Sequence, residues 1–362
     1  MTTSFEERDP RTPAETAVAE PGAEDVALNA GSADRTARSG EHSWRHVAHD
    51  LGTRSAIVWI WIALIIAYSL LEPSSFFRVG TFQTIFSSQQ ALVFLTLGLL
   101  CTMCVGEYVD LSIASVLGLS ATMIPVLVVN DHWNVAIASV VAVAAAGLAG
   151  AFNGYLVVYL GVDVIIVTLG SGTFILGLTL WMSHLGEVVG LSSSFASIDL
   201  KSILGLPISF YYGLVLILLF AYVLECTPLG RRMRFVGANR EVARLSGIRV
   251  KRIRFGAFVM GGVFCGLGGL LASAGIGGFD PNSSQTYLLP AFATVSLGTA
   301  VIQPGRFNPI GTFVAIYFLA TGILGLELLG AAGWVSDVFY GGSLVVAVTV
   351  ATVLRRRLLL SH

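Results

Sequence analysis

The chain has four cysteines and six histidines, the residue types best suited to redox chemistry or metal binding. Cys101 and Cys104 have the CxxC spacing of a dithiol redox site. However, they lie in an apolar segment without the water access or the βαβ context that such a site needs. His42, His46 and His49 share helical spacing, but no thiolate or well-placed fourth ligand accompanies them. We expect neither a redox site nor a metal site.

The sequence also lacks the motifs of catalysis and of nucleotide binding. It carries no HExxH motif and no nucleophile elbow, and its apolar segments contain no histidine or paired carboxylates. A phosphate-binding P-loop needs Gly-Lys followed by Ser or Thr, but the only lysines, Lys201 and Lys251, follow Leu200 and Val250. We expect that the chain is not an enzyme and binds no cofactor, so any ATP and Mg would be used by a separate partner.

Composition indicates an all-α polytopic membrane protein. Hydrophobic residues make up 55% of the chain and charged residues only 12%, with 40 glycines and a mean hydropathy of +0.79. A water-soluble core of this apolarity is not credible. The balance of 21 basic against 22 acidic residues argues against a nucleic-acid partner and leaves the lipid bilayer as the expected surroundings.

Residues 227–255 form the only long, strongly charged segment between strongly apolar ones. They hold nine of the 21 Lys and Arg residues. One such residue at a bilayer centre costs roughly 2.5 to 3.5 kcal/mol, so the segment must lie in water, and its basic bias places it in the cytoplasm.

Within this loop, a short helix is predicted over residues 240–246. Asn239 is suited to its N-cap and Gly247 to its C-terminal end. Ala238, Val242 and Leu245 share one face of the helix, which is too short to be stable without a surface to lie against. Glu241 and Arg244 lie at pairing distance on the other face. The alternative is a basic loop that only sets membrane topology and contains a chance amphipathic turn.

Ten apolar stretches are predicted as membrane spans. They lie near residues 57–71, 85–105, 111–129, 135–159, 163–183, 210–226, 256–275, 286–302, 310–328 and 334–354. Six spans before the basic loop and four after it place all basic clusters, and both termini, in the cytoplasm. The residues then expected on the outer side are Asp131, Glu187, Asp199, Lys201, Asp280, Glu327 and Asp337.

Four regions follow from this layout. Residues 1–42 contain almost no large apolar side chains and are predicted to be a disordered cytoplasmic tail. Residues 43–55 fit an interfacial helix. Residues 56–355 form the transmembrane domain, including the cytoplasmic loop 227–255, and residues 356–362 form a cytoplasmic tail. No cleaved signal peptide is expected, so the first apolar segment remains an anchor.

Several stretches together resemble one transporter family. GANREVARLSGI, GEYVDLSIAS, AFNGYLV, VIIVTLGSGT and LLPAFATVSLGTAVIQPGRFNPIGT are similar to segments of the ribose-type sugar permeases of ABC importers, within the branched-chain amino acid/ribose-type family. The resemblance runs from about residue 57 to residue 357. Glu107 and Tyr108 depart from the pattern, because they replace a glycine pair.

The resemblance implies a type II ABC importer-like fold and the permease subunit of an importer for a ribose- or xylose-like monosaccharide or a polyol. It implies a location in the bacterial plasma (inner) membrane. It also implies alternating access driven by a separate ATPase subunit of the tandem type. The other implied partners are an extracytoplasmic sugar-binding protein and a second permease copy, as a homodimer or heterodimer.

The same resemblance implies roles for particular residues. The segment expected to couple to the ATPase comprises Gly237, Asn239, Glu241, Val242, Ala243, Arg244, Leu245, Ser246 and Gly247. The translocation path is expected around Asn153, Thr168 and Gly298. Asp110 is predicted to cap the start of the third span, because its carboxylate can meet the free N–H groups there.

The main alternative function is an ion-coupled secondary transporter of a small polar solute. Such a protein usually places ionisable residues in the middle of the membrane. Asp163 and Glu225 lie instead near the ends of predicted spans. A membrane scaffold without transport is a third possibility, disfavoured by the glycine-rich spans and the resemblance.

Overall fold

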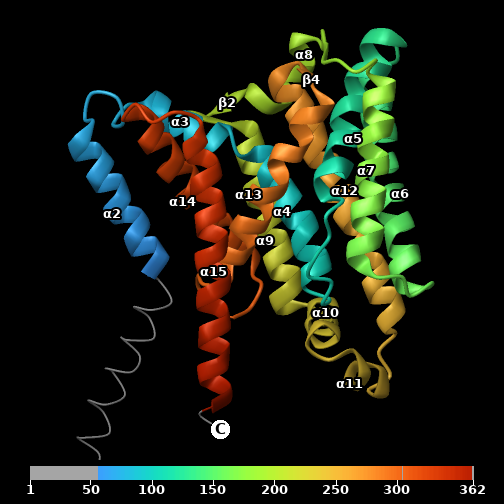
Figure 1. Ribbon diagram of the computed structural model, residues 1–362. Helices are drawn as coiled ribbons and strands as arrows, with labels where there is room; N and C mark the ends of the chain where they lie inside the picture. The colour runs from blue at the N-terminus through green and yellow to red at the C-terminus, as the bar shows by residue number, and fades with distance from the viewer. Residues whose placement is uncertain (1–55, 304, 361–362) are drawn as a thin grey trace, which may run out of the picture. The chain divides into compact units, whose positions relative to one another are not determined.

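The computed structural model of the chain describes residues 56–303 and 305–360, with side-chain surroundings up to residue 349. The predicted tail 1–42, the predicted interfacial helix 43–55 and the three spaced histidines lie outside these residues. The element labels below are those of Figure 1.

The described residues are mostly α-helical. The helices are α2 (Ala56–Leu71), α3 (Val79–Ser87), α4 (Gln90–Met103), α5 (Ile113–Pro125), α6 (Val135–Val158), α7 (Val164–Met182), α8 (Ser193–Leu200), α9 (Ile208–Cys226), α10 (Pro228–Ala238), α11 (Arg240–Leu245), α12 (Val250–Ile276), α13 (Leu288–Gly298), α14 (Pro309–Leu328) and α15 (Trp334–Leu360). A π-helical turn, Val126–Asn130, extends α5, and a 3-10 helix, Pro281–Tyr287, precedes α13. The strands have two residues each: β1 (Val188–Val189) pairs with β4 (Gly278–Phe279), and β2 (Ser202–Ile203) with β3 (Leu206–Pro207), both antiparallel.

Seven helices of the described part are long and apolar enough to cross a membrane. They are Val79–Cys104, Ile113–Asn130, Val135–Val158, Val164–Met182, Ile208–Cys226, Val250–Ile276 and Pro309–Leu328. The apolar parts of α2 and α15 are shorter. Helix α13 has 11 residues, a rise of about 16 Å against a hydrocarbon core of about 30 Å. The chain is a multi-pass membrane protein, while the count of ten spans and the cytoplasmic position of both termini stay predictions.

The core lies where α12 packs against α4, α5 and α6. Small residues allow this close approach, because a Cβ atom at Gly98 would lie 2.8 Å from the backbone oxygen of Gly261. A Cβ atom at Gly262 would overlap the backbone oxygen of Ala146. Glycines therefore allow these helices to pack closely, as small residues do between membrane helices.

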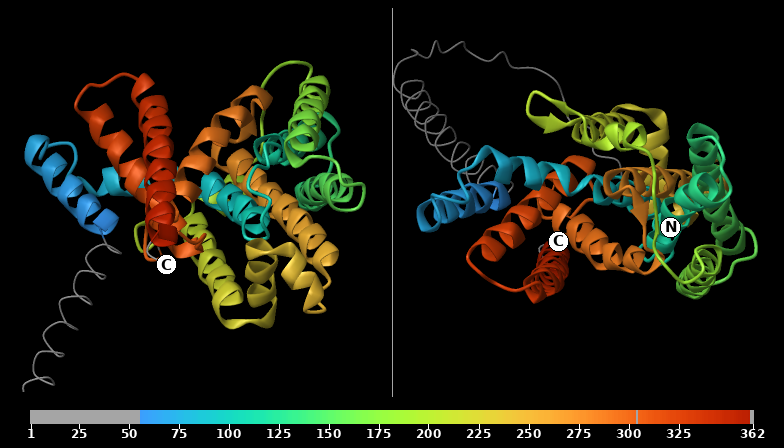
Figure 2. Two further views of the ribbon diagram at one scale, coloured as in Figure 1. Left: turned by 60° about the horizontal axis from the view of Figure 1, so that its bottom comes forward. Right: turned by 90° about the horizontal axis from the view of Figure 1, so that it is seen from above.

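Helix α14 organises the other side of the transmembrane domain, where it contacts α2, α13 and α15. Figure 2 shows α2 in blue and α15 in red beside it, apart from the α4–α6–α12 group. The Trp61 indole donates to the Thr321 hydroxyl at 3.0 Å, and the Tyr68 hydroxyl donates to the Gly322 backbone oxygen at 3.1 Å. These bonds satisfy polar groups that would be costly in lipid.

The segment between α7 and α9 lies at the end of the helices opposite α10 and α11 (Figure 1). It contains β1, α8 and the β2–β3 hairpin. Asp199 belongs to this end, and its side chain is buried, only 7% exposed. Its position on the outer side of the membrane stays a prediction. Helix α8 packs on α12, and the Asp199 carboxylate lies against Gly275.

Candidate functional site

The basic loop folds into two consecutive helices, of which α10 was not predicted. Thr227 caps α10, since its hydroxyl accepts from the Gly230 N–H at 3.3 Å, and Pro228 occupies the first helical position. Met233 and Val236 are buried, while the arginines lie on more exposed positions. The Thr-Pro pair at the start of α10 is the local sequence signal for this helix.

Helix α11 is the predicted short helix, and its boundaries are confirmed to within one residue. The Asn239 side-chain oxygen accepts from the N–H groups of Glu241 and Val242, at 3.0 and 3.1 Å. Gly247 ends the turn with φ of +78°, a conformation that side-chain-bearing residues rarely adopt. Glu241 and Arg244 form an exposed ion pair at 2.5 Å.

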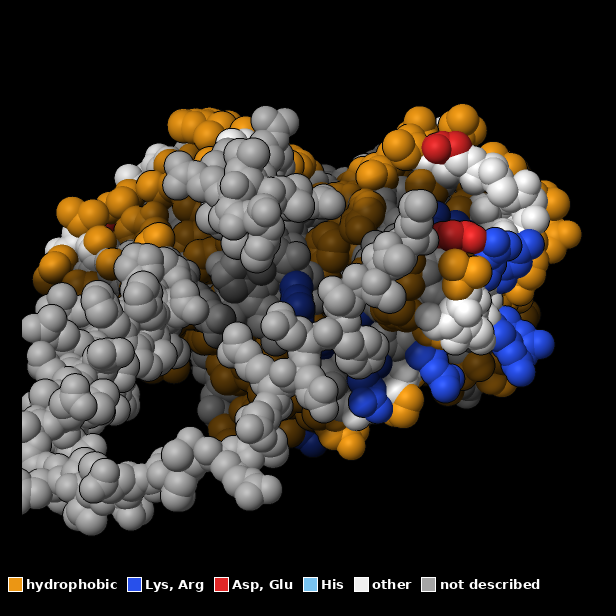
Figure 3. Space-filling model, turned by 90° about the horizontal axis from the view of Figure 1, so that it is seen from below, with side chains coloured by type: hydrophobic (Ala, Val, Ile, Leu, Met, Phe, Trp, Pro, Cys, Tyr) orange, Lys and Arg blue, Asp and Glu red, His pale blue; other side chains and the backbone are white. Residues whose placement is uncertain are grey.

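The three apolar side chains of α11 divide into one that packs within the chain and two that do not. Ala243 is fully buried. Val242 is 45% exposed and Leu245 is 78% exposed, so both offer apolar surface among charged neighbours. Figure 3 shows Lys and Arg side chains gathered on this end of the described surface. The predicted coupling segment thus forms one basic surface with an apolar tip.

The turn after α4, residues 105–112, receives α10 and α11. A Cβ atom at Gly237 would overlap the backbone oxygen of Cys104, so only glycine fits at this contact without a shift. The Arg240 guanidinium at the start of α11 donates to the Gly106 backbone oxygen at 2.7 Å and to the Glu107 carboxylate at 2.9 Å. Arg254 at the start of α12 donates to the same carboxylate oxygen at 2.5 Å.

The second half of this turn is bonded to α6 and α7. The Asp110 carboxylate accepts from the backbone N–H and the hydroxyl of Ser112, at 3.0 and 2.7 Å. Ser112 is the N-cap residue of α5, so Asp110 fixes the residue before the helix and does not bond the free N–H groups of its first turn, which corrects the predicted cap. Asn153 of α6 donates to the Ser112 hydroxyl at 2.9 Å, and Thr168 of α7 accepts from the Leu111 N–H at 3.1 Å. Burial raises the pKa of the Asp110 carboxyl, and the bonds from Ser112 lower it.

The structure therefore brings Asp110, Asn153 and Thr168 together at one turn, all of them buried. It does not bring Gly298 to them. Gly298 lies on α13 against Thr312 of α14, and its backbone oxygen accepts from the Asn308 side chain at 3.1 Å. The assignment of Asn153, Thr168 and Gly298 to a translocation path stays a prediction.

Glu107, Arg240 and Arg254 belong to this site but were not among the predicted site residues. Glu107 was noted only as a departure from a glycine pair. A carboxylate directly after a long apolar helix needs a buried partner, and this requirement was the available signal. The partner could not be chosen from the sequence, because many arginines of the basic loop were equally available.

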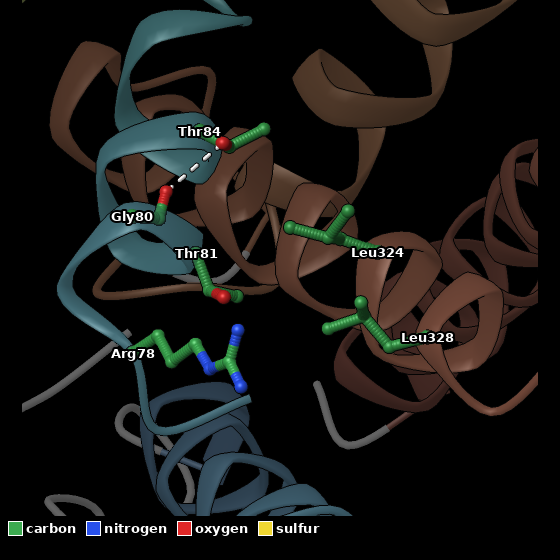
Figure 4. Close-up of a pocket in the computed structure, with 6 residues that line it drawn as sticks. All are labelled: Arg78, Gly80, Thr81, Thr84, Leu324 and Leu328. Carbon is green, nitrogen blue, oxygen red and sulfur yellow. Dashed lines mark hydrogen bonds between the residues drawn. The ribbon is translucent and has the colours of Figure 1, made fainter. Parts of the chain in front are cut away.

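Two pockets in the described part do not contain the predicted path residues. One, of about 300 Å³, lies between α3 and α14 and is lined by Arg78, Gly80, Thr81, Thr84, Leu324 and Leu328. Figure 4 shows the Arg78 guanidinium across from the two leucines, and both threonine hydroxyls already donate to backbone oxygens. The other, of about 390 Å³, is almost entirely apolar. Neither offers the several convergent polar groups that a sugar requires.

The chain matches the model of the family described as "Branched-chain amino acid transport system / permease component" over residues 82–348. It is 30% identical to the autoinducer 2 import system permease protein LsrC of Salmonella typhimurium over 298 residues, 82% of this chain and 85% of that protein. It is 33% identical to LsrC of an Enterobacter species over 288 residues, 78% and 82% of the two chains.

The D-allose transport system permease protein AlsC of Escherichia coli is 27% identical over 290 residues, covering 80% of this chain and 89% of that protein. No solved structure gives a significant match to the chain. The resemblance read from the sequence motifs is confirmed, and the chain is a transport subunit and not an enzyme. With this match over most of its length and alignments that cover 82% to 89% of these relatives, the chain belongs to the branched-chain amino acid transport system permease family.

Proposed function

We propose that this chain is the permease subunit of an ABC importer that carries a monosaccharide or polyol, with a ribose- or xylose-like sugar as the substrate class. A separate ATPase hydrolyses Mg-bound ATP, and an extracytoplasmic binding protein delivers the sugar. Two permease copies form the path in a bacterial inner membrane. The name of the D-allose relative supports a monosaccharide as substrate.

The exposed apolar tip of α11 is the observation that carries this proposal. Leu245 and Val242 lie on a short helix that begins at the N-cap Asn239 and ends before Gly247. Exposed leucine on a basic cytoplasmic surface fits a helix that inserts into a groove of a partner. The contacts of α10 and α11 with the turn 105–112 supply a route from such a partner to α6 and α7.

Reconstitution in liposomes tests the proposal. The chain is combined with the ATPase and the binding protein of the same importer, and uptake of tritiated D-ribose, D-xylose and D-allose is measured. The expected result is uptake of at least one sugar that requires internal ATP, the ATPase and the binding protein together. Uptake that survives without the ATPase and collapses with the proton gradient would establish the ion-coupled secondary transporter instead.

A further inference from the structure

Glu107 is a buried carboxylate shared by two arginines from different helices. Its side chain is 4% exposed, against 14% for Arg254 and 44% for Arg240. Its ion-pair contacts with the two arginines converge on the same oxygen, Oε1. A buried charge is tolerated only when it is paired and hydrogen-bonded, and here one negative charge meets two positive ones.

The two arginines are not equivalent. Arg254 donates from Nε, and its Nη2 lies 2.5 Å from the same oxygen as an ion-pair contact; its side chain is only 14% exposed. This pair alone neutralises Glu107. Arg240 uses only Nη2 toward Glu107, and its half-exposed guanidinium keeps access to water. Breaking the Arg240 bond therefore leaves no unpaired buried charge, whereas loss of Arg254 would remove the main partner.

The same turn extends the contact beyond Glu107. Arg240 also donates a hydrogen bond to the Gly106 backbone oxygen. Gly106 has φ of +85°, so the turn is in a left-handed conformation at that residue. Five and six residues later, Leu111 and Ser112 bond to Thr168 of α7 and Asn153 of α6, respectively. A displacement of α11 that pulls on Arg240 is thus transmitted through one short turn to two membrane helices.

We propose that Glu107 is a positioning residue for coupling: with Arg254 as its permanent partner and Arg240 as a releasable one, it latches α11 to the turn that holds α6 and α7. This inference rests on the proposed function, in which α11 receives the motion of the ATPase. It adds a specific ion-pair latch at a position where the family pattern has a glycine.

The test compares Arg240→Gln, Glu107→Gln and Arg254→Gln in the full complex of permease, ATPase and binding protein in nanodiscs. The main readout is the ratio of ATPase activity with the sugar-loaded binding protein to that without it. The sugar is whichever of D-ribose, D-xylose and D-allose the wild type takes up. Arg240→Gln should keep normal membrane abundance and ATPase co-purification but lower this ratio by about tenfold, the effect of losing one charged hydrogen bond.

A second readout is amide hydrogen exchange in residues 240–245, which should be about tenfold faster in Arg240→Gln, because α11 loses its tie to the turn. Arg240→Lys keeps the charge and should restore part of the stimulation. Arg254→Gln should instead reduce thermal stability and membrane abundance. Asp131→Asn, which removes an exposed carboxylate at the outer end, is the charge control and should behave as wild type.

The outcomes separate the two levels of inference. If the wild-type complex shows no ATP-dependent uptake, the proposed function fails and the latch fails with it. If the wild type is active and Arg240→Gln keeps wild-type stimulation and exchange rates, only the latch is overturned. If Glu107→Gln does not reach the membrane, the result for Arg240→Gln decides whether the latch exists. The exposed Arg240 side chain can be replaced without leaving an unpaired buried charge.

Discussion

Truncation of Leu245 to alanine should weaken binding of the ATPase without harming the permease itself. The side chain is 78% exposed, so the fold gains little from it. Full burial of a leucine side chain stabilises by about 1.5 to 3 kcal/mol, and the exposed part could therefore contribute about 1 to 2 kcal/mol to a partner groove. The dissociation constant for the ATPase should rise by about five- to thirtyfold.

The assay is titration of the detergent-solubilised permease with purified ATPase, followed by fluorescence anisotropy. Leu204→Ala is the matched control, because Leu204 is 93% exposed but lies in the β2–β3 turn at the opposite end. Both variants should keep the wild-type melting temperature. An ATPase affinity of Leu245→Ala within twofold of the wild type would refute the coupling role and leave α11 as part of a loop that only sets topology.

Three further predictions concern packing, pH and topology. Gly237→Ala should cost about 1 to 3 kcal/mol of stability, seen as a lower melting temperature, because its Cβ atom would overlap the Cys104 oxygen; an unchanged value would contradict this contact. Burial raises the pKa of Asp199, partly offset by a hydrogen bond from Ser209, so its native state holds the proton more tightly than its unfolded state. Stability should then fall as the pH rises from the unfolded pKa of about 3.9 through the folded pKa, and Asp199→Asn should raise the melting temperature at pH 7 but not near pH 3. In a cysteine-free background, Gly190→Cys and Asn282→Cys should react with an impermeant maleimide in intact cells while Arg240→Cys should not, and external labelling at position 240 would overturn the layout.

The features that could be predicted from the sequence depend on composition or on neighbouring residues. Apolar composition determined the membrane class, because such a chain cannot fold as a soluble domain. The bounds of α11 followed from Asn239 and Gly247, since capping is a local interaction between residues two or three positions apart. The family motifs pointed to a permease for the same reason, because each motif is a continuous stretch of sequence.

Only the tertiary structure decided which distant residues meet. Glu107 and Arg254 are 147 positions apart, and Ser112 and Asn153 are 41 apart. Helix periodicity could not reveal these pairs, because the lipid-facing and protein-facing sides of a membrane helix are both apolar and show little contrast. The burial of Asp199 and the separation of Gly298 from Asn153 and Thr168 were hidden for the same reason. Each depends on how whole helices pack, and the close contacts of their glycines and small residues decide that packing.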